Sequence, residues 1–234
     1  MRMDGSLSTA PRWTPVFERI SDEKRRRVLQ SAKVAFARDG FAGTNVNLVA
    51  AAAGISVGAL YKYFRTKADL FLAIVDEYEF LLGGALENIF SSEPTFAGRI
   101  EALIRAAVRS AQDDPELLRI YVDCTTEALS GMAVELSGRI ETVSATMYRR
   151  MIAEAAASGE IASDVDPAFA AFLLDDIFLM IQFSYASTYY RNRLRIFIGE
   201  ARDDTEAVVA AAMRFIMRTF EPRLDAARII APSP

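Results

Sequence analysis

Apolar residues recur along this chain at intervals of three and four positions, which is the spacing of helices that bury one face. The segment 21–40 shows the pattern clearly, because charged positions flank a single apolar stripe of Val28, Ala32, Ala35 and Phe36. Ser21 is expected to be the N-cap of this helix and Gly40 to end it. No stretch of any length alternates as a half-buried strand does, so the pattern predicts an all-α protein.

Later helices are marked by their first residues. Thr66 and Asp69 form a capping pair, and Pro residues follow Asp114 and Asp166 at first-turn positions. We therefore expect six further helices, beginning near Thr66, Pro94, Asp114, Met132, Asp166 and Thr205. The helix from Asp166 is expected to run to about Tyr190 and the one from Thr205 to Phe220.

The segment 51–64, AAAGISVGALYKYF, contains the pattern G-x-S-x-G around Ser56. In α/β-hydrolases this pattern carries a nucleophilic serine, which follows a strand and passes its proton to a base. This chain has no histidine, and the alanines at 50–53 favour a helix before the serine. Gly54 is expected to end that helix and Ser56 to cap the next. Helix, tight turn and helix are the parts of a helix-turn-helix, and a hydrolase remains the less favoured alternative.

The second helix of this pair has the residues of a DNA-reading helix. Its first residues, Val57, Gly58 and Ala59, are small and permit close approach to the floor of a major groove. Basic groups that donate to phosphate and flat rings that lie against the backbone follow: Tyr61, Lys62, Tyr63 and Lys67. The N-terminal end of the helix adds a partial positive charge. Lys67 is expected to make a sequence-independent phosphate contact.

Charge divides the chain in the same way. The net formal charge is −4, but residues 21–67 hold nine basic and three acidic residues, a net charge of +6. Residues 1–20 carry +1 and residues 68–234 carry −11. A basic segment at 21–67 followed by an acidic remainder suggests that the basic segment binds a polyanion. A solvated charged surface would give the same distribution of charge.

Residues 21 to about 75 resemble the TetR family of bacterial transcriptional regulators. The resemblance is carried by TNVNLVAAAAGISVGALYKYFRTKADLF, with its A-G-[IV]-S-x-G-x-[LIV]-Y-x-Y-F core and the K-x-x-L that follows. Asn45, Asn47, Leu48 and Val49 depart from the residues common in the first short helix of the family. The resemblance implies DNA contacts from Thr44, Asn45, Asn47 and Ser56, in addition to those named above. It also implies an N-terminal extension (1–20), a DNA-binding domain (21–67) and a helical effector-binding and dimerisation body (68–234).

The expected helix 166–190 is apolar nearly all round and must be covered on two sides. The last helix covers one side, and a second subunit across a two-fold axis covers the other. The family resemblance implies the same homodimer, in which two heads read two half-sites of a near-palindromic operator. The expected interface residues are Phe169, Phe172, Leu173, Met180, Phe215 and Phe220. A monomeric core, or a helical dimerisation module without DNA binding, would be the alternative.

The family resemblance further implies a small effector held between the body helices, whose binding releases a repressor from DNA. Candidate lining residues are Leu103, Ala107, Tyr121, Cys124, Thr125, Met147, Met151 and Phe178. Ordinary core residues would show the same spacing. Mixed Met, Tyr and Phe side chains suit a hydrophobic or aromatic effector.

The composition argues against several other classes of protein. One cysteine and no histidine argue against a metal sensor, and no motif indicates a cofactor or catalysis. A single cysteine cannot form an internal disulfide, and the N-terminus lacks the apolar segment of a signal peptide, so we expect a cytoplasmic protein. Asp175 and Asp176 interrupt the apolar segment 168–187, which favours a soluble buried helix over a membrane span.

Overall fold

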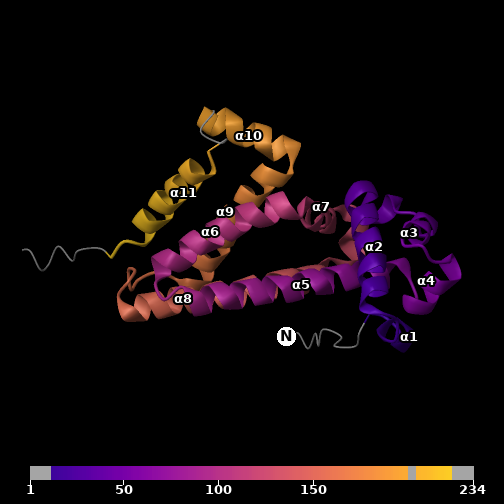
Figure 1. The fold of residues 1–234 in the computed structure, drawn as a ribbon. Helices are drawn as coiled ribbons and strands as arrows, with labels where there is room; N and C mark the ends of the chain where they lie inside the picture. The colour runs from indigo at the N-terminus through magenta and orange to yellow at the C-terminus, as the bar shows by residue number, and fades with distance from the viewer. Residues whose placement is uncertain (1–11, 200–203, 223–234) are drawn as a thin grey trace, which may run out of the picture. The chain divides into compact units, whose positions relative to one another are not determined.

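The computed structural model describes residues 12–199 and 204–222 of the chain (Figure 1). Within these ranges every regular element is helical, which confirms the all-α prediction. The chain divides into two compact units, one of Met1–Gly84 with Ala111–Val143 and the other of Ala85–Ser110 with Ser144–Pro234. Helices α5 (Lys67–Ser92), α6 (Phe96–Asp113) and α8 (Ala133–Ser158) each contribute residues to both units.

The first unit contains the short N-terminal helices and the elements that pack beneath them. Its helices are α1 (Pro15–Glu18), α2 (Asp22–Gly43), α3 (Val46–Ala52), α4 (Val57–Tyr63), most of α5, α7 (Pro115–Cys124), the 3-10 turn η1 (Glu127–Met132) and the start of α8. The apolar stripe of α2 is buried as expected, together with Val49 of α3, Leu60 of α4 and Phe71 of α5. Burial of these side chains on several helices fixes α3 and α4 as one body.

Helix α7 is held against α2 by two polar contacts. The Lys33 ammonium lies 2.6 Å from the Asp114 carboxylate, and the Phe41 backbone N–H donates to Asp123 Oδ2 at 2.5 Å. Gly40 has φ of +68°, and a Cβ there would lie 3.2 Å from Asp123 Oδ1. A glycine is therefore needed at the bend of α2 both for its backbone conformation and for the approach of Asp123.

Most of the predicted helix starts are confirmed. Ser21 accepts from the Lys24 N–H at 3.3 Å, and Thr66 and Asp69 form the reciprocal capping pair at 3.0 and 3.1 Å. Thr44, which precedes the first short helix, does not cap it. Asn45 is the N-cap, accepting from the Asn47 N–H at 2.9 Å, because the Thr44 hydroxyl instead donates back to the Gly40 carbonyl at 2.7 Å.

The second unit contains most of α6, the C-terminal part of α8, α9 (Pro167–Ala186), α10 (Thr188–Ile198) and α11 (Thr205–Phe220). The expected single helix from Asp166 to Tyr190 is wrong, because the chain leaves helical conformation at Ser187 (φ −107°, ψ 132°). Arg191 donates to the carbonyl of Tyr185 at 2.8 Å and so satisfies an end group of α9. The bounds expected for the last helix are confirmed.

Charged contacts join the helices of this unit. The Arg105 guanidinium pairs with Glu206 of α11 at 2.5 Å, and Arg99 pairs with Glu154 of α8 at 3.0 Å.

Helix α9 buries Ala171, Leu174 and Phe178 on one face. Helix α9 is long and apolar enough to cross a membrane, and 28% of its most apolar window is buried in the protomer. The expected burial of α9 is therefore realised on one side only.

Candidate nucleic-acid interface

Helices α3 and α4 meet at an angle of 99° across the turn Ala53–Ser56. Gly54 adopts φ of +64°, and the Ile55 N–H donates to the Ala50 carbonyl at 3.0 Å. Arg27 of α2 donates to the Ala53 carbonyl at 2.9 Å and so satisfies the end of α3. This geometry is that of a helix-turn-helix.

Ser56 has a structural role at the start of α4. Its hydroxyl oxygen accepts from the Ala59 backbone N–H at 3.1 Å, which confirms the predicted N-cap. The element before Ser56 is helix α3, whereas a nucleophile elbow requires a strand. The local fold therefore lacks the support that a hydrolase would need at this serine.

The residues proposed to contact DNA fall into three groups by exposure. Those on the solvent side of α3, the turn and α4 are exposed: Asn45, Asn47, Ser56, Gly58, Tyr61 and Lys62. Val57, Ala59 and Lys67 are half-buried, whereas Thr44 and Tyr63 are buried. Six of the eleven are therefore open to solvent on or beside α3 and α4.

The buried and half-buried members are engaged within the protein. Thr44 bonds back to α2, and the Tyr63 ring packs on Phe17 with ring centroids 5.4 Å apart. The Lys67 ammonium donates to the carbonyls of Ala42 and Thr44, both at 3.2 Å, and lies 4.9 Å from the Phe41 ring centroid. Their DNA contacts remain predictions, to be weighed against these internal roles.

Two further features of this surface are visible in the structure. Leu48 of α3 is 58% exposed, although it is a large apolar residue. The segment Arg12–Ile20 packs on the end of α4, with Phe17 2% exposed. The pairing of Trp13 and Phe17 four residues apart was the signal that an apolar face was present in this segment.

Comparison with known proteins decides the family of this head. Residues 28–74 match the family model described as bacterial regulatory proteins, tetR family. The helix-turn-helix head belongs to the TetR family. The match covers α3, the turn and α4, together with most of α2 and the first part of α5.

Relatives of known name match part of this chain. A nucleoid occlusion factor SlmA from Actinobacillus pleuropneumoniae serotype 5b (strain L20) is 32% identical over 82 residues, which are 35% of this chain and 41% of that protein. The chain thus spans less than half the length of that relative.

Solved structures extend the likeness to the whole fold. A TetR family transcriptional regulator from Chloroflexus aurantiacus J-10-fl has a TM-score of 0.62 at 20% identity, covering 90% of this chain and 99% of its own. FadR from Bacillus subtilis, in complex with stearoyl-CoA, has a TM-score of 0.66 at 16% identity and covers 82% of this chain and 96% of its own. At these identities the likeness establishes the fold.

The candidate effector residues of this TetR-like chain lie in both units. Tyr121, Cys124 and Thr125 line a cavity of about 310 Å³ in the first unit, where the Tyr121 hydroxyl donates to Glu141 at 2.9 Å. Burial raises the pKa of the Cys124 thiol to about 12, so this cysteine is not a thiolate at neutral pH. The other five are buried in the second unit: Leu103, Ala107, Met147, Met151 and Phe178.

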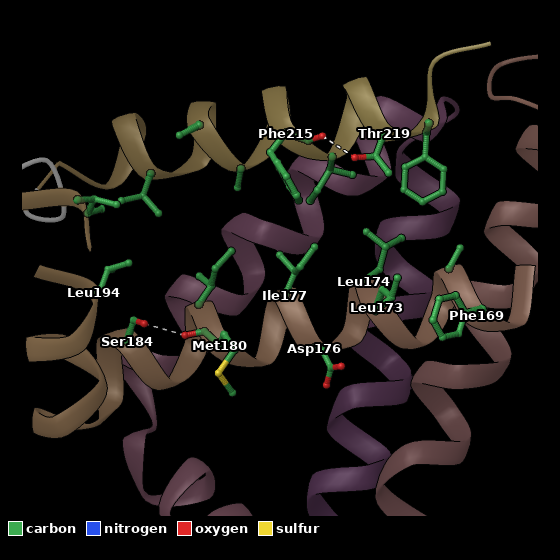
Figure 2. Close-up of a pocket in the computed structure, with 18 of the residues that line it drawn as sticks. Phe169, Leu173, Leu174, Asp176, Ile177, Met180, Ser184, Leu194, Phe215 and Thr219 are labelled. Atoms are coloured by element: carbon green, nitrogen blue, oxygen red, sulfur yellow. Dashed lines mark hydrogen bonds between the residues drawn. The ribbon is translucent and has the colours of Figure 1, made fainter. Parts of the chain in front are cut away.

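A larger apolar groove of about 800 Å³ lies between α9 and α11 in the second unit (Figure 2). In the figure, Phe215 of α11 points toward α9, and Ile177 of α9 points toward α11. Phe169 and Phe215 line the groove and are 61% and 66% exposed. Of the other residues expected at a dimer interface, Leu173, Met180 and Phe220 also line it.

Phe172 and Phe220 differ in their surroundings. Phe172 is 60% exposed on α9 and lies beside Phe169, with ring centroids 6.4 Å apart. Phe220 is 6% exposed, and its ring packs edge-on against Phe96 of α6 at 5.2 Å. Phe220 therefore already has a partner within its own protomer.

Proposed function

We propose that this protein is a transcriptional regulator, most simply a repressor, that binds a near-palindromic DNA operator as a homodimer. A small hydrophobic or aromatic effector releases it from DNA. Residues 21–67 are the DNA-binding domain and residues 68–234 the effector-binding and dimerisation body. Such a protein works in the cytoplasm, on the chromosome.

The observation that carries the proposal is the α3–turn–α4 geometry on a basic segment. The two helices cross at 99°, and both carry exposed polar groups, among them Asn47, Tyr61 and Lys62. The net charge of +6 over residues 21–67 favours a polyanionic partner. In a helix-turn-helix the second helix, here α4, enters the major groove and the first crosses the backbone.

The groove between α9 and α11 supports the dimer. Large apolar side chains that remain exposed around a continuous groove mark an interaction site in a soluble protein. Phe169, Phe172 and Phe215 are each at least 60% exposed within the protomer. A second copy that inserts the same residues by two-fold symmetry covers both surfaces at once, and two heads then read two half-sites.

Two observations support an apolar effector. The residues proposed to contact it are apolar or sulfur-containing except for Tyr121 and Thr125, and Met151 is fully buried. The structural relative FadR is in complex with stearoyl-CoA, an apolar chain on a polar carrier. Long-chain acyl compounds are therefore the first effectors to test.

The proposal is tested by selection from a random duplex library at roughly physiological salt, where non-specific binding is suppressed. We expect the retained duplexes to share an inverted repeat with half-sites about one helical turn apart. Acyl compounds are then added to the complex, and release is followed by fluorescence anisotropy. Failure to retain duplex at any salt concentration would exclude the DNA-binding function.

A further inference from the structure

The N-terminal segment Arg12–Ile20 closes the C-terminal end of the recognition helix α4. The Thr14 backbone N–H donates to the Tyr63 carbonyl at 2.9 Å, and the Thr14 hydroxyl donates to the Lys62 carbonyl at 2.5 Å. The last carbonyls of a helix have no partner within it, so these two bonds satisfy groups that would otherwise need water. Thr14 therefore ties the segment to the backbone of α4.

An aromatic cluster holds the same segment in place. The Phe17 ring is 2% exposed and lies 4.8 Å from the Phe64 ring and 5.4 Å from the Tyr63 ring, measured between centroids. The Trp13 ring also packs against Phe17, with centroids 6.0 Å apart. The segment is thus part of the core beneath α4, and its position and that of α4 depend on each other.

One residue before this cluster, the chain is anchored to a different helix. Arg12 pairs with Glu135 in the first turn of α8, and the Arg12 side chain is only 14% exposed. Glu135 is also 3.5 Å from Arg139 Nε, and Arg139 Nη1 donates to Asp76 of α5 at 2.6 Å. A charge held in such surroundings is costly to leave without its partner, so the pairing of Arg12 with Glu135 is a firm anchor.

The two anchors are separated by one residue, Trp13. A chain this short spans at most about 7 Å between the Cα atoms of Arg12 and Thr14, so it has little slack to absorb a displacement of either end. We propose that Arg12 is a positioning residue and that Arg12–Ile20 is a strap. The strap transmits displacements between the first turn of α8 and the C-terminal end of α4.

This proposal gives the N-terminal segment a role in regulation, and it rests on the proposed function. Helix α8 continues into the second unit, where Met147 and Met151 are buried. A ligand that favours one position of α8 would therefore bias the position of α4 through Arg12, in addition to any effect through α5. The coupling needs only two states that the ligand and the DNA stabilise differently.

The strap is tested first without DNA, by amide hydrogen exchange on the full chain. Glu135→Gln removes the charge but keeps the shape of the side chain, and Arg12→Gln removes the other partner. Each variant is expected to speed exchange of residues 60–65 roughly fivefold to tenfold, although Glu135 is far away in sequence. The double variant is expected to add nothing to either single change, and Arg12→Lys is expected to restore most of the protection.

Glu79→Ala is the matched control. Glu79 lies 3.8 Å from Arg139 in the same charged cluster, but within the described residues it forms no ion pair with Arg12. In Glu79→Ala, amide exchange at residues 60–65 is expected to match that of the wild type. Unchanged exchange in Glu135→Gln would overturn the strap, as would an equal effect of Glu79→Ala.

DNA binding gives a second test, because the strap and simple electrostatics predict opposite changes in operator affinity. Removing an acidic charge near a DNA-binding head should strengthen binding by electrostatics alone. We instead expect Glu135→Gln and Arg12→Gln to weaken binding to the selected operator about tenfold with no change in salt slope, because neither residue contacts phosphate. Tighter binding in Glu135→Gln, or a smaller slope in Arg12→Gln, would overturn the positioning role. If the variants speed exchange at residues 60–65 as expected but the wild type binds no duplex, the proposed function is refuted and the strap still stands.

Discussion

At the scale of single residues, two lysines on the head have opposite surroundings although sequence reasoning treated them alike. Lys62 is exposed on α4, and its side chain has no hydrogen bond within the described part of the protein. The Lys67 ammonium is held by two backbone carbonyls and lies over the Phe41 ring. Lys62 is therefore free to neutralise phosphate, whereas Lys67 must first break its contacts with the turn between α2 and α3.

We expect Lys62→Ala to weaken binding to all duplexes alike and to reduce the salt slope by about one. Lys67→Ala should instead lower the free energy of unfolding by about 1–2 kcal/mol, because it leaves the carbonyls of Ala42 and Thr44 without their donor. Anisotropy titrations at several salt concentrations and urea unfolding measure the two effects. If Lys67→Ala reduces the salt slope by about one and leaves stability unchanged, Lys67 contacts phosphate after all.

These residues also show where sequence reasoning stops. The caps at Ser21, Ser56 and Thr66 were predictable because each depends on a few neighbouring positions. The burial of Tyr63 was not, because its partner Phe17 lies forty-six positions earlier on a separate helix. Local pattern therefore located the helix-turn-helix, and tertiary contacts decided which of its side chains remain open.

At the scale of elements, alanine substitutions at two glycines of the helix-turn-helix are expected to affect folding stability and DNA binding differently. Gly54 has φ of +64° and Gly58 lies in the first turn of α4, and a Cβ added at either would meet nothing within 4 Å. Any effect of alanine at these positions is therefore one of backbone conformation or of approach to a partner, not of packing.

Gly54→Ala should destabilise the fold by about 1–2 kcal/mol, because alanine resists positive φ. Gly58→Ala should stabilise it by roughly 0.5–1 kcal/mol, because alanine favours the helix, yet weaken operator binding by blocking close approach to the groove floor. Thermal unfolding and anisotropy titration on the same samples separate these effects. Wild-type affinity in Gly58→Ala would place the first turn of α4 away from the DNA.

The break between α9 and α10 is an element that the pattern could not reveal. Residues 166–190 carry no Pro or Gly after the first turn, and their apolar residues fit helical spacing throughout. The chain bends at Ser187, where Arg191 donates to the Tyr185 carbonyl and α10 packs on α9. A bend stabilised by contacts made only after folding leaves no signal in periodicity.

At the scale of the whole molecule, reading two half-sites requires that two heads be joined by an interface strong enough to hold at low concentration. The exposed side of α9 and the facing side of α11 offer three large aromatic residues for this purpose, Phe169, Phe172 and Phe215. Each would appear twice in a two-fold interface. Burial of a single phenylalanine contributes about 2 kcal/mol, so one substitution removes about 4 kcal/mol from the dimer.

We therefore expect Phe169→Asp and Phe215→Asp each to raise the dimer dissociation constant about a thousandfold or more. Light scattering coupled to size exclusion should show a monomer that keeps its helical circular dichroism. Phe80→Asp is the matched control, since Phe80 is 80% exposed on α5 in the first unit, outside the groove. Because a single head makes half of the contacts, operator affinity should fall with dimerisation in the two Phe variants and stay unchanged in the control. If both Phe variants remain dimers that bind the operator normally, the groove is not the subunit interface, and its volume of about 800 Å³ would fit a small apolar ligand.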